Sequence, residues 1–178
     1  MLELKLFGPF RLKGPLGSVE LSSTKLRALL AYLTLLGPKG ETRERLTSLL
    51  WGSHFEEQAR QNFRQALTRL KKVIGSEVVL VDDRLVMLSP GSVSTDVARF
   101  EELVRAGSEA DLREAVGLAD RELLSGIEVQ EAPWEEWLSG ERRRLASLLG
   151  DALMSLGEIE FESGNATAAL GRGKAAIR

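Results

Sequence analysis

Cysteine is absent from the 178 residues, and histidine occurs once, at position 54. Without cysteine the chain can form no disulfide, thiolate metal site or iron–sulfur cluster, and it has no cysteine nucleophile. A single histidine provides neither an H-E-x-x-H motif nor clustered metal ligands. The segment 171–174 is only superficially similar to a phosphate-binding loop, because Ala175 stands where Ser or Thr should follow the lysine. We therefore predict that the chain is not an enzyme and needs no cofactor.

Long apolar runs are also missing. No stretch approaches the roughly 20 apolar residues of a membrane-spanning helix. The N-terminus, MLELKLFGPF, lacks the basic segment and apolar core of a secretory signal. Hydrophobic residues make up 43% of the chain and charged residues 28%, which is ordinary for a globular protein. We expect a cytoplasmic protein with no membrane partner, folded as one large domain or two small ones.

Charge is divided unevenly along the chain. Residues 1–90 hold 14 Lys and Arg against 9 Asp and Glu, a net charge of +5. Residues 91–178 hold 10 against 17, a net charge of −7. This division is typical of a protein in which one part meets a polyanion and the other does not. Chance clustering of solvated charge gives the same distribution, so charge alone leaves both explanations open.

In the basic half, apolar and polar residues first alternate, and apolar residues then recur at helical spacing. Apolar and polar residues alternate in three short runs within residues 2–21, separated by Gly-Pro turns, which predicts a three-stranded antiparallel sheet. Leucines at helical spacing then predict a helix that ends at Gly37 and a second helix that Thr42 caps and that ends near Trp51. A third helix is predicted over residues 58–74 after a connector.

Two β-rich runs follow, at 78–81 and 84–88, and predict a hairpin around a two-residue turn, Asp82–Asp83. Strands, three helices and a hairpin in this order are typical of a winged helix-turn-helix, with the hairpin as the wing. From residue 96 onward the pattern is helical, with a turn-like stretch at 126–133 and a further helix at 166–177. Its long helices with small-residue faces indicate helix-pair repeats, although no repeat period is clear.

The predicted helix near residues 57–72 has two unlike faces. One is an apolar stripe at helical spacing, made of Ala59, Phe63, Ala66, Leu67 and Leu70. The other is basic and rich in amides, and arginine and glutamine can each make two hydrogen bonds to a base edge in the major groove. We expect four of its residues to face bases: Gln61, Arg64, Gln65 and Thr68.

The remaining basic residues of this half are predicted to contact the phosphate backbone. On the third helix these are Arg60, Arg69, Lys71 and Lys72. Arg43 and Arg45 at the start of the second helix and Arg84 in the hairpin complete the main set, and Lys25 and Arg27 are further candidates. The competing explanation for all of them is solvated surface charge. The three tryptophans, Trp51, Trp134 and Trp137, are more typical of core or interdomain anchors than of base-stacking platforms.

Seven ordered segments resemble the SARP-type (antibiotic regulatory protein) transcriptional activators. They are LFGPFRL (6–12), TKLRALLAYL (24–33), RERLTSLLWG (43–52), ARQNFRQALTRLKKVIG (59–75), STDVARFEELV (94–104), ELLSGIEV (122–129) and PWEEWLSGERRRL (133–145). The resemblance implies an α+β fold: an OmpR-like winged helix-turn-helix (three-stranded sheet, three helices, C-terminal hairpin) over residues 1–91. An all-α, tetratricopeptide-like bacterial transcriptional activator domain would follow over residues 92–178, cut short relative to the family.

The resemblance also implies a function and partners. We expect a sequence-specific DNA-binding transcriptional regulator, an activator that binds promoter direct repeats on double-stranded DNA through the helix 58–74. RNA polymerase would contact the connector 52–57, and the helical domain would form a homo-oligomer on DNA. The alternative is a protein-interaction adaptor whose winged helix binds protein. An adaptor would expose apolar residues on the 60–72 face, where the sequence has none.

Overall fold

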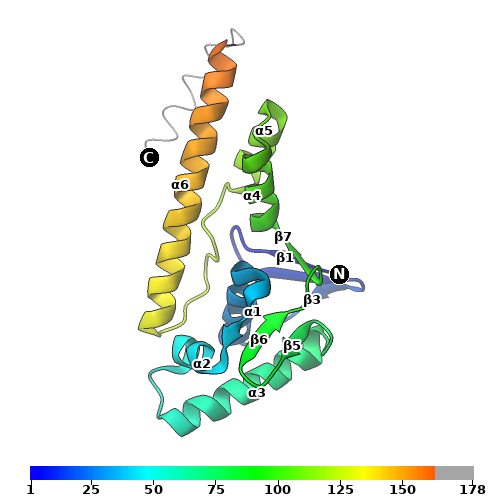
Figure 1. The fold of residues 1–178 in the computed structure, drawn as a ribbon, viewed down its shortest axis with the longest axis vertical. Coiled ribbons are helices and arrows are strands. Elements are labelled where there is room, and N and C mark those ends of the chain that lie inside the picture. The colour runs from blue at the N-terminus through cyan, green and yellow to red at the C-terminus, as the bar shows by residue number, and fades with distance from the viewer. Residues whose placement is uncertain (163–178) are drawn as a thin grey trace.

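The computed structural model describes residues 1–162, and these residues form a mixed α/β fold with two small sheets and six α-helices (Figure 1). The first sheet has the order β3-β2-β1-β7. Strands β1 (Leu2–Lys5), β2 (Arg11–Gly14) and β3 (Gly17–Val19) form the predicted antiparallel meander. Leu4 lies opposite Leu12, and both are buried, because alternate residues of each strand point into the core.

A fourth strand of this sheet was not predicted. Strand β7 (Val93–Thr95) pairs in parallel with β1, so that Leu2 lies opposite Val93. The prediction of a three-stranded sheet is therefore wrong by one edge strand. The chain between residues 91 and 96 thus belongs to the sheet of the N-terminal half, at the point where we place the division between the two predicted domains.

Helices α1 (Thr24–Leu36) and α2 (Arg43–Trp51) follow the meander, with a short 3-10 turn, η1 (Gly37–Lys39), between them. Gly37 ends α1 with a φ of 74°, a conformation that favours glycine. Thr42 caps α2 as predicted, since its side chain accepts a hydrogen bond from the Arg45 amide at 3.1 Å. Helix α3 (Glu56–Ile74) begins two residues before the predicted start.

The second sheet has the order β4-β6-β5 and is antiparallel. It joins β4 (Glu41–Thr42), β5 (Val79–Val81) and β6 (Leu85–Leu88). The predicted two-residue turn between the hairpin strands is wrong, because three residues, 82–84, connect β5 to β6. The Asp82 carboxylate accepts hydrogen bonds from the Arg84 and Leu85 amides at 2.8 and 2.6 Å, which closes the longer loop and lowers the pKa of Asp82.

The helical half contains α4 (Asp96–Ala106), α5 (Glu109–Leu118) and α6 (Ala132–Glu162). Helix α5 packs against both α4 and α6. Between α5 and α6, residues 119–131 run back along the molecule, so that α6 begins beside α2 and extends away from it (Figure 1). The helix predicted over 166–177 lies outside the described residues.

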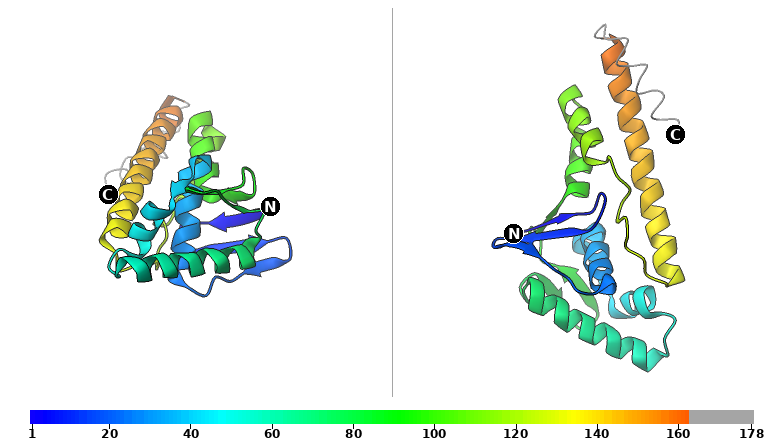
Figure 2. Two further views of the ribbon diagram at one scale, coloured as in Figure 1. Left: turned by 60° about the horizontal axis from the view of Figure 1, so that its bottom comes forward. Right: turned by 180° about the vertical axis from the view of Figure 1, so that it is seen from behind.

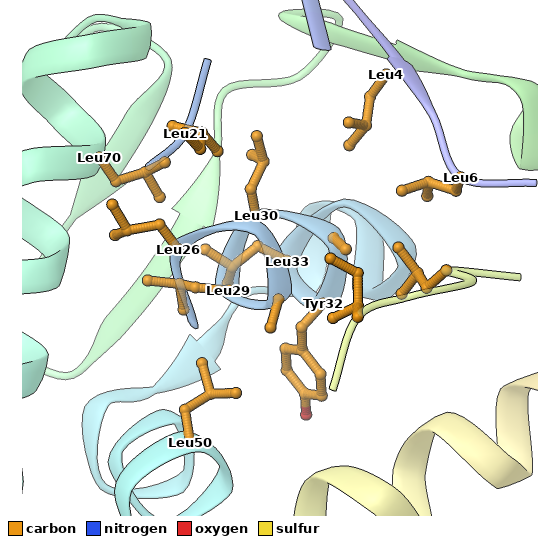
Figure 3. Close-up of a cluster of buried hydrophobic side chains, with 14 of the residues drawn as sticks. Leu4, Leu6, Leu21, Leu26, Leu29, Leu30, Tyr32, Leu33, Leu50 and Leu70 are labelled. Atoms are coloured by element: carbon orange, nitrogen blue, oxygen red, sulfur yellow. The ribbon is translucent and has the colours of Figure 1, made fainter. Parts of the chain in front are cut away.

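One apolar core joins the sheets to the helical half. Leucines from β1, α1, α2 and α3 converge around α1 (Figure 3), and Phe100 of α4 and Trp134 of α6 belong to the same cluster. Trp51 and Trp134 are buried, and the half-buried Trp137 packs on Tyr32 with ring centroids 4.8 Å apart. These contacts confirm the prediction that the tryptophans are anchors. The core positions α3 at the end of the molecule opposite the far end of α6.

Candidate nucleic-acid interface

Helix α3 is packed along one face only. Its buried residues are those of the predicted stripe together with Ile74: Ala59, Phe63, Ala66, Leu67, Leu70 and Ile74. Phe63 meets Trp51 of α2 edge-on, with ring centroids 6.0 Å apart. This packing fixes the rotation of α3 about its axis, and so fixes which side chains point outward.

The four predicted base-contact residues are all exposed. Gln61, Gln65 and Thr68 follow one another at spacings of four and three residues and form a single outer row. The Thr68 hydroxyl donates to the Arg64 carbonyl at 2.9 Å, which leaves its oxygen able to accept a hydrogen bond. No part of α4, α5 or α6 lies beyond α3 in any view (Figures 1 and 2).

Lys72 extends the outer row by one helical turn, and it is exposed. We predicted a phosphate contact for this residue, but its position places it in line with Gln61, Gln65 and Thr68. The spacing of 61, 65, 68 and 72 in the sequence could have shown this before the structure did. The row extends about 16 Å at 1.5 Å per residue, which is several base pairs at the roughly 3.4 Å spacing of duplex DNA.

The predicted phosphate contacts occupy different positions around this row. Arg69 is exposed on α3, Lys71 is half-buried, and Arg60 is paired with Glu56 one turn earlier. Arg45 is exposed on the first turn of α2. An acidic partner on the same helix means that Arg60 has to share its charge between Glu56 and any phosphate.

Arg43 and Arg84 lie where α2 meets the hairpin. The Arg43 guanidinium donates to the Asp82 carbonyl at 3.1 Å, and the Arg43 amide donates to the Arg84 carbonyl at 3.2 Å. The Arg84 side chain itself is exposed. These bonds hold the start of α2 against the hairpin loop, so α2 and the hairpin keep a fixed relation to each other.

An open groove of about 1060 Å³ lies between α2, the first half of α3 and the hairpin loop. Three of the predicted contacts, Arg43, Arg60 and Arg64, line it together. Its acidic lining residues are Glu44, Glu56, Glu57 and Asp83. The other predicted contacts do not line this groove: Gln61, Gln65, Thr68, Arg69, Lys71, Lys72, Arg45 and Arg84. The groove therefore has mixed charge, and the uninterrupted basic and amide surface lies further along α3.

Two further candidates have partners within the chain instead. Lys25 donates to the Glu131 carboxylate at 3.0 Å and lies over the Trp51 ring, 5.4 Å from its centroid. Arg27 donates to the Leu21 carbonyl at 2.8 Å. We therefore remove both from the predicted phosphate contacts. The partner of Lys25 could not be inferred from the sequence pattern, since Glu131 is 106 residues away from Lys25.

Two classes of site receive no support from residues 1–162. No group of three or more His, Asp or Glu side chains in this part of the chain is placed to hold a metal ion. None of the helices in the same part has the length and apolar character needed to cross a membrane.

No family model and no curated protein matches the sequence. Among solved structures, Mycobacterium tuberculosis EmbR in complex with a low-affinity phosphopeptide is similar, with a TM-score of 0.77 at 20% identity. The similarity covers 98% of this chain and 49% of the other, so this chain spans about half the length of the structure it matches. At this identity the likeness shows the fold alone.

Proposed function

We propose that the protein is a sequence-specific DNA-binding transcriptional regulator whose N-terminal half is a winged helix-turn-helix. Helix α3 enters the major groove, and the β5–β6 hairpin is the wing. One observation carries the proposal: the arginine- and glutamine-rich face of α3 is exposed, while the opposite face is locked into the core. The major groove, about 12 Å wide, admits a helix presented in this way.

Different residues contact the bases and the phosphates, according to their position on α3 and α2. Gln61, Gln65 and Thr68 face base edges from the outer row. Arg64 reaches base edges from the side of α3 that lines the protein groove beside α2. Arginine paired with guanine, and glutamine paired with adenine, are the bidentate contacts that discriminate bases best. Arg69, Lys71, Arg43 and Arg45 contact phosphates and set the register of the protein on the duplex.

The wing makes a peripheral contact. Arg84 is exposed and free to reach a phosphate beside the groove that α3 occupies. Asp82 and Asp83 are both exposed, and both would be repelled by phosphate. The wing therefore approaches DNA through Arg84 at its side, with the loop tip held away from the groove.

The helical half meets protein. Its negative charge disfavours DNA, and it extends α6 well away from α3. We propose that it forms a homo-oligomer on promoter direct repeats, that RNA polymerase contacts the 52–57 connector, and that the result is activation in the cytoplasm. Phe55 of this connector is 90% exposed, which suits a contact with protein. The fold likeness to EmbR, a protein solved with a bound phosphopeptide, is compatible with a protein-binding role for part of this chain.

The adaptor alternative has less support. Between residues 60 and 72, the exposed side chains of α3 are all polar or charged, and the first exposed apolar one is Val73. A protein-docking face would carry apolar anchors near its centre.

Mobility shifts with a selected promoter fragment at 50 and 200 mM salt test the proposal. About six phosphate contacts should reduce affinity roughly a thousandfold across this range. Tight binding that ignores salt, or no binding to any duplex, would favour the adaptor.

A further inference from the structure

Glu131 is one of two buried carboxylates in the described part of the chain, and several donors surround it. It precedes α6, its side chain is 3% exposed, and its backbone carbonyl accepts hydrogen bonds from the Trp134 and Glu135 amides at 3.0 and 3.1 Å. A buried carboxylate without partners is strongly unfavourable, so the groups that surround it are those the fold cannot lose without cost.

Those groups come from the connector that leads into α3. The Ser53 amide donates to Glu131 Oε2 at 2.8 Å, and the Ser53 hydroxyl donates to Oε1 at 2.9 Å. Lys25 Nζ of α1 donates to the same Oε1 at 3.0 Å. Burial raises the pKa of Glu131, but the hydrogen bonds from Lys25 and Ser53 and the charge of Lys25 outweigh it, so the pKa lies below its ordinary value.

A second path leads from Lys25 to the inner face of α3. The Lys25 ammonium lies over Trp51, and Trp51 packs edge-on against Phe63 of α3. The connector and the buried stripe of α3 are therefore both connected to Glu131, the residue that precedes α6. The connector has few other anchors among the described residues. The His54 amide donates to the Trp51 carbonyl at 3.1 Å, and Phe55 points into solvent.

We propose that Glu131 is a positioning residue, which latches the 52–55 connector and the first turn of α3 in the arrangement that binds DNA. The helical half thereby acts on the DNA-binding helix through the residue that precedes α6, and any movement of the start of α6 releases the connector. This inference rests on the proposed function for its effect on DNA, but the latch itself is independent of DNA.

The test compares Glu131→Gln with Glu136→Gln, a matched change at an exposed position one turn into α6. Amide hydrogen exchange on the free protein is the first readout. Glutamine keeps one acceptor and loses the ion pair with Lys25, so exchange should accelerate about tenfold, the equivalent of one charge-assisted hydrogen bond. The amides that report it are Ser53, bonded to Glu131, and His54 and Ala59, bonded to the Trp51 and Phe55 carbonyls. Exchange in Glu136→Gln should match that of the wild type.

DNA affinity is the second readout, measured on the same samples. Affinity should fall about three- to tenfold in Glu131→Gln, because part of the binding free energy then reorders the connector. Ser53→Ala removes the hydroxyl bond and leaves the Lys25 pair, so it should give smaller changes of the same sign even if Glu131→Gln folds poorly.

Unchanged exchange in both Glu131→Gln and Ser53→Ala would overturn the latch. Faster exchange with unchanged affinity would overturn the positioning role. If the wild-type protein binds no DNA, the proposed function fails, and the exchange data alone then decide whether Glu131 holds the connector.

Discussion

Replacing Arg64 by alanine separates base recognition from general attraction to DNA. Arg64 is exposed on the outward side of α3 and lines the groove beside α2, while the buried stripe fixes the helix beneath it. The fold should therefore survive the change, since exposed substitutions usually alter the free energy of unfolding by less than about 0.5 kcal/mol. The substitution should therefore reduce DNA affinity and leave the free energy of unfolding nearly unchanged.

The size of that loss follows from the contact. A bidentate arginine–guanine pair contributes about 1–3 kcal/mol of discrimination, which corresponds to about five- to 150-fold in the dissociation constant at the preferred site. Fluorescence anisotropy at fixed salt, with the selected site and with each single-base variant of it, measures this. Arg64→Ala should equalise the affinities at one position while leaving the other positions ranked as before.

Arg105→Ala is the matched control, because Arg105 is an exposed arginine at the end of α4, in the acidic helical half. It should leave both affinity and base preference unchanged. If Arg64→Ala weakens specific and random DNA by the same factor, Arg64 meets phosphate and the assignment of α3 residues to bases is wrong.

Three further predictions follow from other parts of the molecule. Lys71→Ala should weaken binding to all duplexes alike and reduce the slope of log affinity against log salt by about one unit; a changed base preference would contradict this. Leu70→Ala, at a fully buried position of the α3 stripe, should lower the free energy of unfolding by about 2–5 kcal/mol in urea titrations, and a loss below 1 kcal/mol would mean that α3 is not locked to the core. The pKa of Glu131 is lower in the folded state than its ordinary value of 4.5, so the folded state binds this proton less readily than the unfolded state. The ionised Glu131 therefore stabilises the fold above pH 4.5, and this stabilisation is lost as pH falls through the lower pKa of the folded state. Urea titrations between pH 7 and pH 3 should therefore show a smaller acid-induced loss in Glu131→Gln than in the wild type, and an equal loss would count against the latch.

The sequence predicted the elements whose pattern is local. The stripe of α3 recurs at helical spacing, so its buried residues and its exposed face could both be assigned before any coordinates. The Thr42 cap was equally readable, because threonine before an apolar-periodic segment is a common helix start. Only the helix boundary at Glu56 differed, by two residues.

Features that depend on distant partners were missed. Strand β7 has three residues and gains its identity only from pairing with β1 at the other end of the N-terminal half. The hairpin loop is one residue longer than the two aspartates indicate. The Asp82 carboxylate accepts hydrogen bonds from the Arg84 and Leu85 amides, and these bonds support the turn beside the backbone bond from the Asp82 amide to the Leu85 carbonyl.

The contacts of Glu131 could not be predicted from the sequence either, because its partners are distant in the chain. Ser53 lies 78 residues away from it, and nothing in either local sequence marks the pair. Lys25 was assigned to phosphate because it starts a helix, whereas the fold brings a buried carboxylate to it. Charged residues near helix starts can thus be assigned to DNA only once the rest of the chain is placed.

Cross-linking from the outer row of α3 shows whether this face of the helix lies against DNA bases. The sequence has no cysteine, so Gln65→Cys provides a single attachment point for a photo-activated cross-linker, and Ser147→Cys on the exposed surface of α6 provides the control. Gln65→Cys should cross-link to bases within the selected half-site, whereas Ser147→Cys should not cross-link to DNA. Specific binding without cross-linking from Gln65→Cys, or equal cross-linking from both positions, would contradict this expectation.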